Sequence, residues 1–332
     1  MRGTRVAAPQ FEGLTRIPAL RPNWIGKRDA FKSMDCISII IPVFNRARLI
    51  GRAVHSVLKQ TYPELEIIVV DDGSKDSTSQ VMSDLTREDR RIRYLRHESN
   101  RGAQAARNTG IRAARGDWIG FLDSDDQFLP HSLEARLDVA RKEKVSVVHS
   151  ECNIIQVDGV MKPYRVRPLS GWVYRQLLEA EGPLYQGLLV TKEALTRIGY
   201  LDEKIGAFQE WDTMIRLAKL YPFAFEANPT FTYDCSGSDT ISKNLLRSAR
   251  GYEEVVRKHF FAILRHKGPR AMAQHSRMAA SWYRAGGDLR RVRRCHRMAF
   301  LWAALDPRTT LTFAKSCYSK IAKVAYGTGS QR

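Results

Sequence analysis

Short runs of apolar, β-branched residues alternate along this chain with segments of helical periodicity, and the alternation begins at Cys36. The first run, ISIIIPV at 37–43, predicts a strand buried on both faces. Apolar residues spaced by three and four follow over 49–58, as in an amphipathic helix. Because strands separated by helices need crossover connections, the pattern predicts an α/β fold with a mostly parallel, Rossmann-like sheet and helices on both faces.

The same alternation continues as far as residue 148. We expect further strands at 65–70, 92–95, 118–122 and 145–148. We also expect three further helices, one that begins near Asp76 or Ser77, one at 103–114 and one at 131–142. Beyond Ser242 no segment has strand character, and the sequence predicts amphipathic helices at 252–264, 271–285 and 289–305. The α/β part is therefore expected to carry a helical C-terminal extension.

The two ends of the chain differ in composition from the middle. Residues 1–34 contain three prolines and no sustained period, which predicts an extended or partly disordered arm. The chain has 54 Lys and Arg against 35 Asp and Glu, and residues 245–332 alone hold 19 of the basic and 4 of the acidic ones. Such a basic segment attracts nucleic acid or an anionic membrane surface, although a solvated helix face remains the alternative.

We interpret the basic extension as a peripheral contact with the inner face of a membrane. The residues that supply much of its charge are Arg290, Arg291, Arg293, Arg294 and Arg297. No apolar run approaches the roughly 20 residues that span a bilayer, and no secretory signal is apparent, so we expect a cytoplasmic location. Five cysteines without a CxxC pair argue against a disulfide framework or a zinc site.

Two acidic clusters directly follow predicted strands. Asp71 and Asp72 come after 65–70, and the cluster DSDD at 123–126 comes after 118–122. Carboxyl ends of parallel strands line the ligand-binding crevice of an open α/β sheet, so the clusters should face one pocket. Crowded carboxylates are costly in free energy unless they are neutralised, and a divalent cation is the usual neutraliser. The alternative explanation of these clusters is that their Asp and Ser residues only form turns and cap helices. The sequence therefore implies a metal ion.

Four segments in order, IIIPVFNR, VVDDGSKDST, NRGAQAARNTGI and GDWIGFLDSDD, resemble the inverting family 2 glycosyltransferases over residues 36–155. That resemblance implies a GT-A fold and a metal-dependent glycosyltransferase. The enzyme would transfer a sugar from a nucleoside-diphosphate sugar, with UDP favoured, to a glycan or lipid-linked acceptor in polysaccharide or glycoconjugate synthesis. It also implies a transferase domain at 35–244, divided into a nucleotide-sugar part at 35–155 and an acceptor part at 156–244, before the extension at 245–332.

The resemblance further implies which residues bind the donor. Asp71 and Asp72 would hold the uracil and ribose side of the nucleotide. Asp123, Ser124 and Asp125 match the DxD element, in which Asp125 binds Mg²⁺ or Mn²⁺ on the diphosphate and Asp123 contacts ribose or sugar beside the metal. The remaining donor-side residues form the adjacent wall or lie on the intervening helix: Pro42, Phe44, Asn45, Gly102, Arg107 and Asn108.

An inverting transfer in one step also needs a base for the acceptor hydroxyl. The segment FQEWD at 208–212 resembles the acceptor-side helix of the family, and Glu210 matches its base position although Asp is commoner there. Asp212 is the second candidate, and both acids could instead favour the positive end of a helix. Trp211 either stacks on a sugar or belongs to the core, and His149 either lines the cleft or is a satisfied buried histidine. The small polar loop at 236–242 is expected near the site.

Two other functions have to be weighed. A nucleotidyltransferase also combines an α/β domain with paired acids, but it needs a glycine-rich basic loop after its first strand, where this chain has PVFNR. A nucleic-acid-binding protein would use the basic C-terminal helices, yet those helices lack the aromatic interleaving that stacks bases. A dehydrogenase is disfavoured because no GxGxxG follows any predicted strand.

Overall fold

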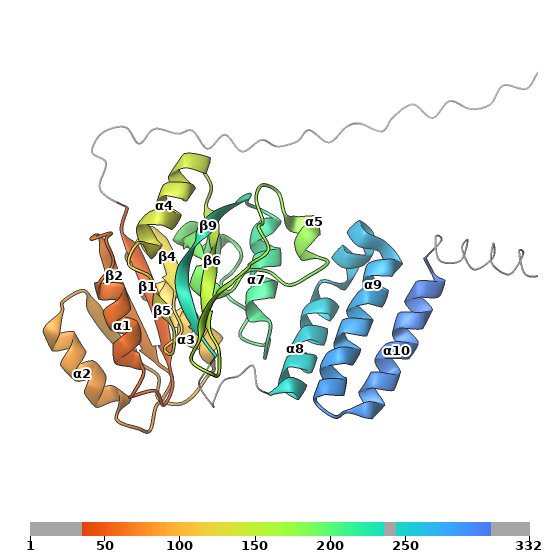
Figure 1. Ribbon diagram of the computed structural model, residues 1–332, viewed down its shortest axis with the longest axis horizontal. Helices are drawn as coiled ribbons and strands as arrows, with labels where there is room; N and C mark the ends of the chain where they lie inside the picture. Colours follow the sequence, from red (N-terminus) through yellow and green to blue (C-terminus); the bar gives the residue numbers. More distant parts are fainter. Residues whose placement is uncertain (1–34, 236–243, 307–332) are drawn as a thin grey trace, which may run out of the picture. The chain divides into compact units, whose positions relative to one another are not determined.

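The structure, a computed structural model, describes residues 35–235 and 244–306 (Figure 1). From Asp35 onward the described residues form one compact unit. The predicted N-terminal arm, the polar loop at 236–242 and Cys317 lie outside the described residues. Within the described ranges, no helix combines the length and the apolar character that crossing a bilayer requires.

One mixed sheet organises the α/β part (Figure 1). Its strands are β1 (Ile37–Val43), β2 (Leu65–Asp71), β3 (Ile92–Arg96), β4 (Trp118–Phe121), β5 (Gln127–Phe128), β6 (Val147–Ile155), β7 (Met161–Tyr164), β8 (Leu189–Thr191) and β9 (Phe223–Asp234). Their order is β3-β2-β1-β4-β8-β6-β9-β5, with β7 paired to β6. The first four strands are parallel to one another, as the crossover pattern predicts, whereas β8 runs antiparallel to both β4 and β6.

The helices of the first half lie where the apolar periodicity predicts them. They are α1 (Ile50–Leu58), α2 (Thr78–Glu88), α3 (Ala103–Ala113) and α4 (Ser132–Glu143). The second half adds α5 (Tyr174–Leu177), the 3₁₀ turn η1 (Tyr185–Gly187), α6 (Lys192–Arg197) and α7 (Gln209–Ala218), and the C-terminal part contains α8 (Leu245–Lys258), α9 (Phe260–Ala285) and α10 (Leu289–Ala304).

The central strand β1 is buried on both faces because its side chains alternate between two apolar clusters. Ile39 and Ile41 belong to the cluster that contains residues of α1, α2 and α4, and Ile40 belongs to the cluster that contains residues of α3 and α7. A Cβ atom on Gly110 of α3 would lie 2.5 Å from Cγ2 of Ile40. The absence of a side chain at this position therefore lets α3 pack directly against β1.

The breaks between the C-terminal helices differ from those expected. The predicted helices at 252–264 and 271–285 leave a gap between them, and within that gap the structure has an interruption of α9, where Gly268 adopts a φ of 75° before Pro269. A second break, between Lys258 and Phe260, was not predicted because no glycine or proline marks it. At this break the His259 side chain is bonded to a residue of α7, a contact described below. Figure 1 shows α8, α9 and α10 side by side, with α10 farthest from the sheet.

Candidate active site

The two acidic clusters follow strands on either side of β1. Asp71 ends β2, and Asp123 comes two residues after the end of β4. Val43 at the end of β1 is in register with Asp71, and its carbonyl accepts a hydrogen bond from the Asp72 amide at 2.8 Å. Because β2, β1 and β4 are adjacent and parallel, both clusters emerge at one edge of the sheet, as the sequence predicts.

The carboxylates of Asp71 and Asp72 are occupied by protein donors. Asp71 is fully buried and accepts bonds from the amide of Ser74 and the hydroxyl of Tyr94, at 2.8 and 2.6 Å. Asp72, 3% exposed, accepts bonds from the backbone amides of Arg101 and Gly102 at 2.9 and 2.7 Å, and also contacts the ring of His97. In this structure the two acids hold the loops after β2 and β3, and their expected contact with a nucleotide remains a prediction.

In the cluster after β4, partly exposed and buried side chains alternate. Asp123 and Asp125 are partly exposed, whereas Ser124 and Asp126 are buried. The carboxylate of Asp123 is held at 2.5 Å by Arg107 and at 2.9 Å by the side-chain amide of Gln186. Two of the four side chains, those of the predicted DxD acids, are therefore the ones with access to a ligand.

Asp125 differs from its neighbours because no other described residue bonds its carboxylate. Burial raises the pKa of Asp125, and the nearby charge of Asp123 raises it further. Among the described residues, no three or more His, Cys, Asp or Glu side chains form a preformed metal cage. Mg²⁺ is commonly bound by one or two carboxylates together with substrate phosphates, so an unpaired carboxylate crowded by like charge fits such an ion.

A buried chain of polar contacts connects Asp123 to helix α7. Arg107, which is 5% exposed, donates to Gln104 at 2.8 Å, and Gln104 donates to the hydroxyl of Tyr185 at 2.9 Å. The Tyr185 hydroxyl is 2.8 Å from that of Thr213 in α7, and the Arg107 guanidinium lies 4.6 Å from the Tyr185 ring centroid. Arg107 is thus fixed between Asp123 and the start of α7.

The other predicted donor-side residues have different surroundings. Gly102 precedes α3 with a φ of 94°, and Asn108 of α3 bonds both the amide and the carbonyl of Leu201, which ties α3 to the segment before α7. Phe44 is 39% exposed directly after β1, and the Asn45 side chain accepts a bond from the amide of Lys75. Asn108 therefore has a structural contact, whereas Phe44 offers an accessible apolar surface beside the strand ends.

Glu210 lies in the first turn of α7, near enough to Arg107 and Asp123 to interact with their charges. Burial raises the pKa of Glu210 above its ordinary 4.5, although the charge of Arg107 opposes this rise and that of Asp123 adds to it. The Glu210 side chain is partly exposed, and no other described residue donates a hydrogen bond to its carboxylate. A partly accessible carboxylate with a raised pKa can accept a proton from a nearby hydroxyl.

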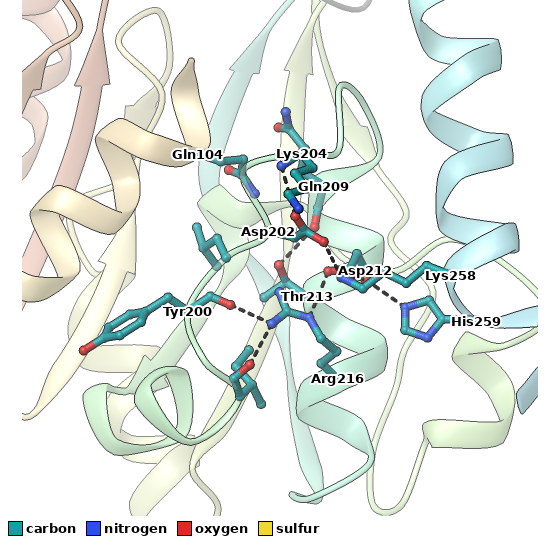
Figure 2. A network of polar contacts seen from close by, with 12 residues as sticks. Gln104, Tyr200, Asp202, Lys204, Gln209, Asp212, Thr213, Arg216, Lys258 and His259 are labelled. Carbon is teal, nitrogen blue, oxygen red and sulfur yellow. Dashed lines mark hydrogen bonds and ion pairs between the residues drawn. The ribbon is translucent and has the colours of Figure 1, made fainter. Parts of the chain in front are cut away.

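Asp212, two residues later, has the opposite environment (Figure 2). Its side chain is 1% exposed and is bonded by Arg216 at 2.9 Å and by both Lys258 and His259 at 2.8 Å. Burial alone would raise the pKa of Asp212, but the bond from His259 and the charges of Arg216 and Lys258 outweigh burial and lower it from 3.8 to about 2. These contacts leave Asp212 without a free oxygen for an acceptor.

Two alternatives left open by the sequence are resolved by burial. Trp211 is fully buried, and its indole donates to the carbonyl of Leu177 at 2.7 Å, so it belongs to the core. His149 is also fully buried, its Nε2 contacts the backbone of Leu169, and burial lowers its pKa to about 4. Neither side chain reaches an open cleft.

Sequence reasoning missed the residues that hold the acids in position. Gln186 of η1 donates to Asp123 and, at 2.6 Å, to Asp126. The buried Arg136 of α4 in turn donates to the carbonyls of Gln186 and Leu188, at 3.0 and 3.1 Å. No motif marks these residues, because they come from segments about 10 to 60 positions from the acids and act through single side chains or carbonyls.

The order of the strands and the helices packed on them are those of a GT-A fold. Residues 38–192, just under half of the chain, match the family described as Glycosyl transferase family 2, so this region is a domain of that family. An uncharacterized glycosyltransferase of Rickettsia felis is 38% identical over 212 residues, which are 61% of this chain and 35% of the relative. The chain therefore spans well under two thirds of the length of that relative.

Two solved structures have the same fold. The first 349 residues of TarS from S. aureus, in complex with UDP-GlcNAc, align with a TM-score of 0.56 and 16% identity, covering 79% of this chain and 90% of that one. The mannosyltransferase PcManGT from Pyrobaculum calidifontis, in complex with GDP-Man and Mn²⁺, aligns with a TM-score of 0.54 and 19% identity, covering 90% and 88%. At these identities the likeness establishes the fold alone.

The opposite pKa shifts of the two acids of α7 predict opposite effects on stability. Replacing Asp212→Asn removes the buried negative charge that Arg216 and Lys258 compensate and should lower the free energy of unfolding at pH 7 by about 2–3 kcal/mol. Glu210→Gln removes a charge that burial disfavours and should change it by less than about 0.5 kcal/mol or increase it. Urea denaturation of both variants measures the difference. Because the pKa of Asp212 is lowered on folding, its contribution is present above pH 4 and is lost as the pH falls through about 2.

A smaller loss in Asp212→Asn than in Glu210→Gln would contradict this assignment of the two acids.

Proposed function

We propose that this protein is an inverting glycosyltransferase that transfers a sugar from a nucleoside-diphosphate sugar to an acceptor hydroxyl. One observation carries the proposal. Of the acids that the sequence motifs single out, Asp125 and Glu210 are the two without a hydrogen bond from another described residue, and both have a raised pKa. One carboxylate on the donor side and one on the acceptor side are what a one-step displacement needs.

The proposed donor site uses the ends of β1 and β2. Phe44 supplies an accessible apolar surface. In this proposal Asp71 and Asp72 hold the loops that bind the nucleotide, because protein donors already occupy their carboxylate oxygens. We favour UDP through the resemblance to the family. The two structural neighbours hold UDP-GlcNAc and GDP-Man, so both nucleotides belong in the test.

Asp125, with Asp123 beside it, is the proposed ligand of Mg²⁺ or Mn²⁺. When bound, such an ion stabilises the negative charge that develops on the leaving diphosphate. The Mn²⁺ complex of PcManGT is in keeping with this proposal. Arg107 keeps Asp123 oriented through its 2.5 Å contact and adds a fixed positive charge near the leaving group.

Glu210 is the proposed base. It would take the proton of the acceptor hydroxyl while that oxygen attacks the anomeric carbon from the side opposite the diphosphate, so the new bond has inverted configuration. Glu210 fits this role better than Asp212, because cations surround the Asp212 carboxylate and hold its pKa near 2. A glycan or lipid-linked acceptor belongs to the same proposal.

The outward face of α10 is the proposed contact with an anionic membrane surface. Val292, Cys295 and Ala299 face the helical bundle, and the opposite side carries exposed arginines followed by exposed apolar residues. These exposed residues, at helical spacing, are Arg290, Arg294, Arg297, Leu301 and Leu305. Basic residues contact anionic headgroups while neighbouring apolar residues enter the interface, which favours membrane over nucleic acid.

Sugar-nucleotide turnover tests the proposed activity. With Mn²⁺ present, the protein should release UDP or GDP from one of a panel of UDP-sugars and GDP-mannose, and EDTA should abolish release. Asp125→Asn should lower turnover by about 10²–10³ because the leaving-group charge is no longer stabilised. Asp138→Asn, an exposed acid of α4, is the matched control and should leave turnover unchanged. Full turnover in Asp125→Asn, or no release from any donor, would overturn the proposal.

The pH profile tests Glu210 as the base. Because its pKa is raised, Glu210 remains protonated to a higher pH than an ordinary glutamate, so the acidic limb of kcat should lie above pH 4.5. Glu210→Gln should lower kcat by about 10²–10⁴ with little change in the KM of the donor. Steady-state kinetics between pH 4 and 9 measures both quantities. Retention of kcat in Glu210→Gln would exclude this role.

Vesicle flotation tests the α10 surface. At about 0.15 M salt the protein should float with vesicles that contain phosphatidylglycerol and remain unbound with pure phosphatidylcholine. The double variant Leu301→Ser, Leu305→Ser should float at least about tenfold less. Phe261→Ser is the control, because Phe261 is exposed on α9 outside this stripe. Equal flotation of the double variant and the wild type would refute the assignment of this face.

A further inference from the structure

Helix α8 contacts the whole segment that leads into Glu210. Arg247 donates to the carbonyl of Gly206 at 2.9 Å, and Glu254 accepts a bond from the amide of the same glycine at 3.3 Å. Between these two residues, Gly251 faces Ala207 so closely that a Cβ atom would lie 2.6 Å from its carbonyl oxygen. The first helix of the C-terminal extension therefore packs directly against the backbone four to three residues before Glu210.

An aromatic contact continues this interface at Phe208. This residue immediately precedes α7 and adopts a left-handed conformation with a φ of 57°, which is unfavourable for a bulky side chain. Its ring packs edge to face against Tyr252 of α8 and Trp282 of α9, with centroid distances of 5.4 and 5.6 Å. The extension thus supplies the contacts that hold an unfavourable backbone conformation at the start of α7.

Beyond Glu210, Lys258 at the end of α8 and His259 directly after it form ion pairs with Asp212. Figure 2 shows Lys258 and His259 on one side of the Asp212 carboxylate, and each lies 2.8 Å from the same oxygen. Lys258 also reaches Asp202, at 2.6 Å, in the segment before α7. On the other side Arg216 bonds the second oxygen of Asp212 and donates to the carbonyls of Ile198 and Tyr200. Contacts from α8 therefore exist on both sides of Glu210.

We propose that α8, together with His259 directly after it, is a positioning element of the active site, in which Lys258 and His259 fix Asp212 and thereby hold the turn of α7 that carries Glu210. These residues do not touch the reacting atoms, and they act through the backbone of 206–212. The inference rests on the proposed function, because it assigns to the extension the alignment of the base with the donor. A displacement of about 1 Å in a reacting group can lower the rate by about 10²-fold, so loss of the contacts between α8 and α7 should have a measurable effect on turnover.

Kinetics of a charge-removing double variant tests the proposal. Lys258→Met, His259→Leu should lower kcat by about 10- to 100-fold. The KM of the donor should change by less than about threefold, because the proposed donor site lies at the ends of β1, β2 and β4 and not on α7 or α8. The conservative pair Lys258→Arg, His259→Gln keeps a donor at each position and should recover most of kcat. Lys267→Met is the matched control, since it removes an ion pair with Glu179 from the same extension and should leave kcat unchanged.

The background of Glu210→Gln separates positioning from general destabilisation. If Lys258 and His259 act through Glu210, the double variant should cause no further loss of residual turnover once Glu210 is Gln. The same 10- to 100-fold loss in both backgrounds would overturn the proposal, and so would an unchanged kcat in the original double variant.

Hydrogen exchange gives a measurement that needs no turnover. The amides of 209–213 should exchange at least about tenfold faster in Lys258→Met, His259→Leu than in the wild type, while those of β1 and β2 remain equally protected. Wild-type protection at 209–213 would refute the positioning role of α8. If the wild type turns over no sugar nucleotide, the proposed function fails, and this comparison alone decides the role of α8.

Discussion

Buried carboxylates need partners, and this requirement organises the structure around the strand ends. An ionised carboxylate removed from water costs several kcal/mol unless charges or hydrogen bonds compensate it. Asp72 therefore determines the path of the loop that enters α3, and Asp123 determines the position of Arg107. Asp212 does the same for the contact between α7 and α8. Asp125 and Glu210 stand out because, within residues 35–235 and 244–306, no other residue donates a hydrogen bond to their carboxylates.

The convergence of the acidic clusters could be predicted from the sequence because it depends only on strand order and direction. Runs such as 37–43 and 65–70 are continuous and β-branched, and crossover connections allow few topologies for them. The resemblance to family 2 glycosyltransferases is likewise confirmed by the matched family. The partners of the acids could not be predicted, since Gln186 reaches Asp123 across 63 positions through a single amide.

The second half of the sheet was harder to predict for a different physical reason. The sequence predicts a strand at 145–148, whereas β6 extends to Ile155, and the sequence pattern did not identify the strand at Phe223–Asp234, where β9 lies beside β6. Pro229 falls inside β9, and the register with β6 shifts near Glu151, so the local pattern contains a residue typical of strand ends. These strands are specified by pairing with each other more than by their own periodicity.

The close approach of Gly251 to Ala207 has a consequence for how the protein is divided into parts. The matched family region ends at residue 192, before Glu210, and the contacts that hold the Glu210 turn come from beyond residue 244. A boundary drawn at residue 192 separates Glu210 from Arg107 and Tyr185, and one drawn at residue 244 separates it from the contacts of α8. Because residue 251 has no Cβ atom, the first C-terminal helix lies directly against the backbone at Ala207, and the α/β part and these helices pack as one compact unit.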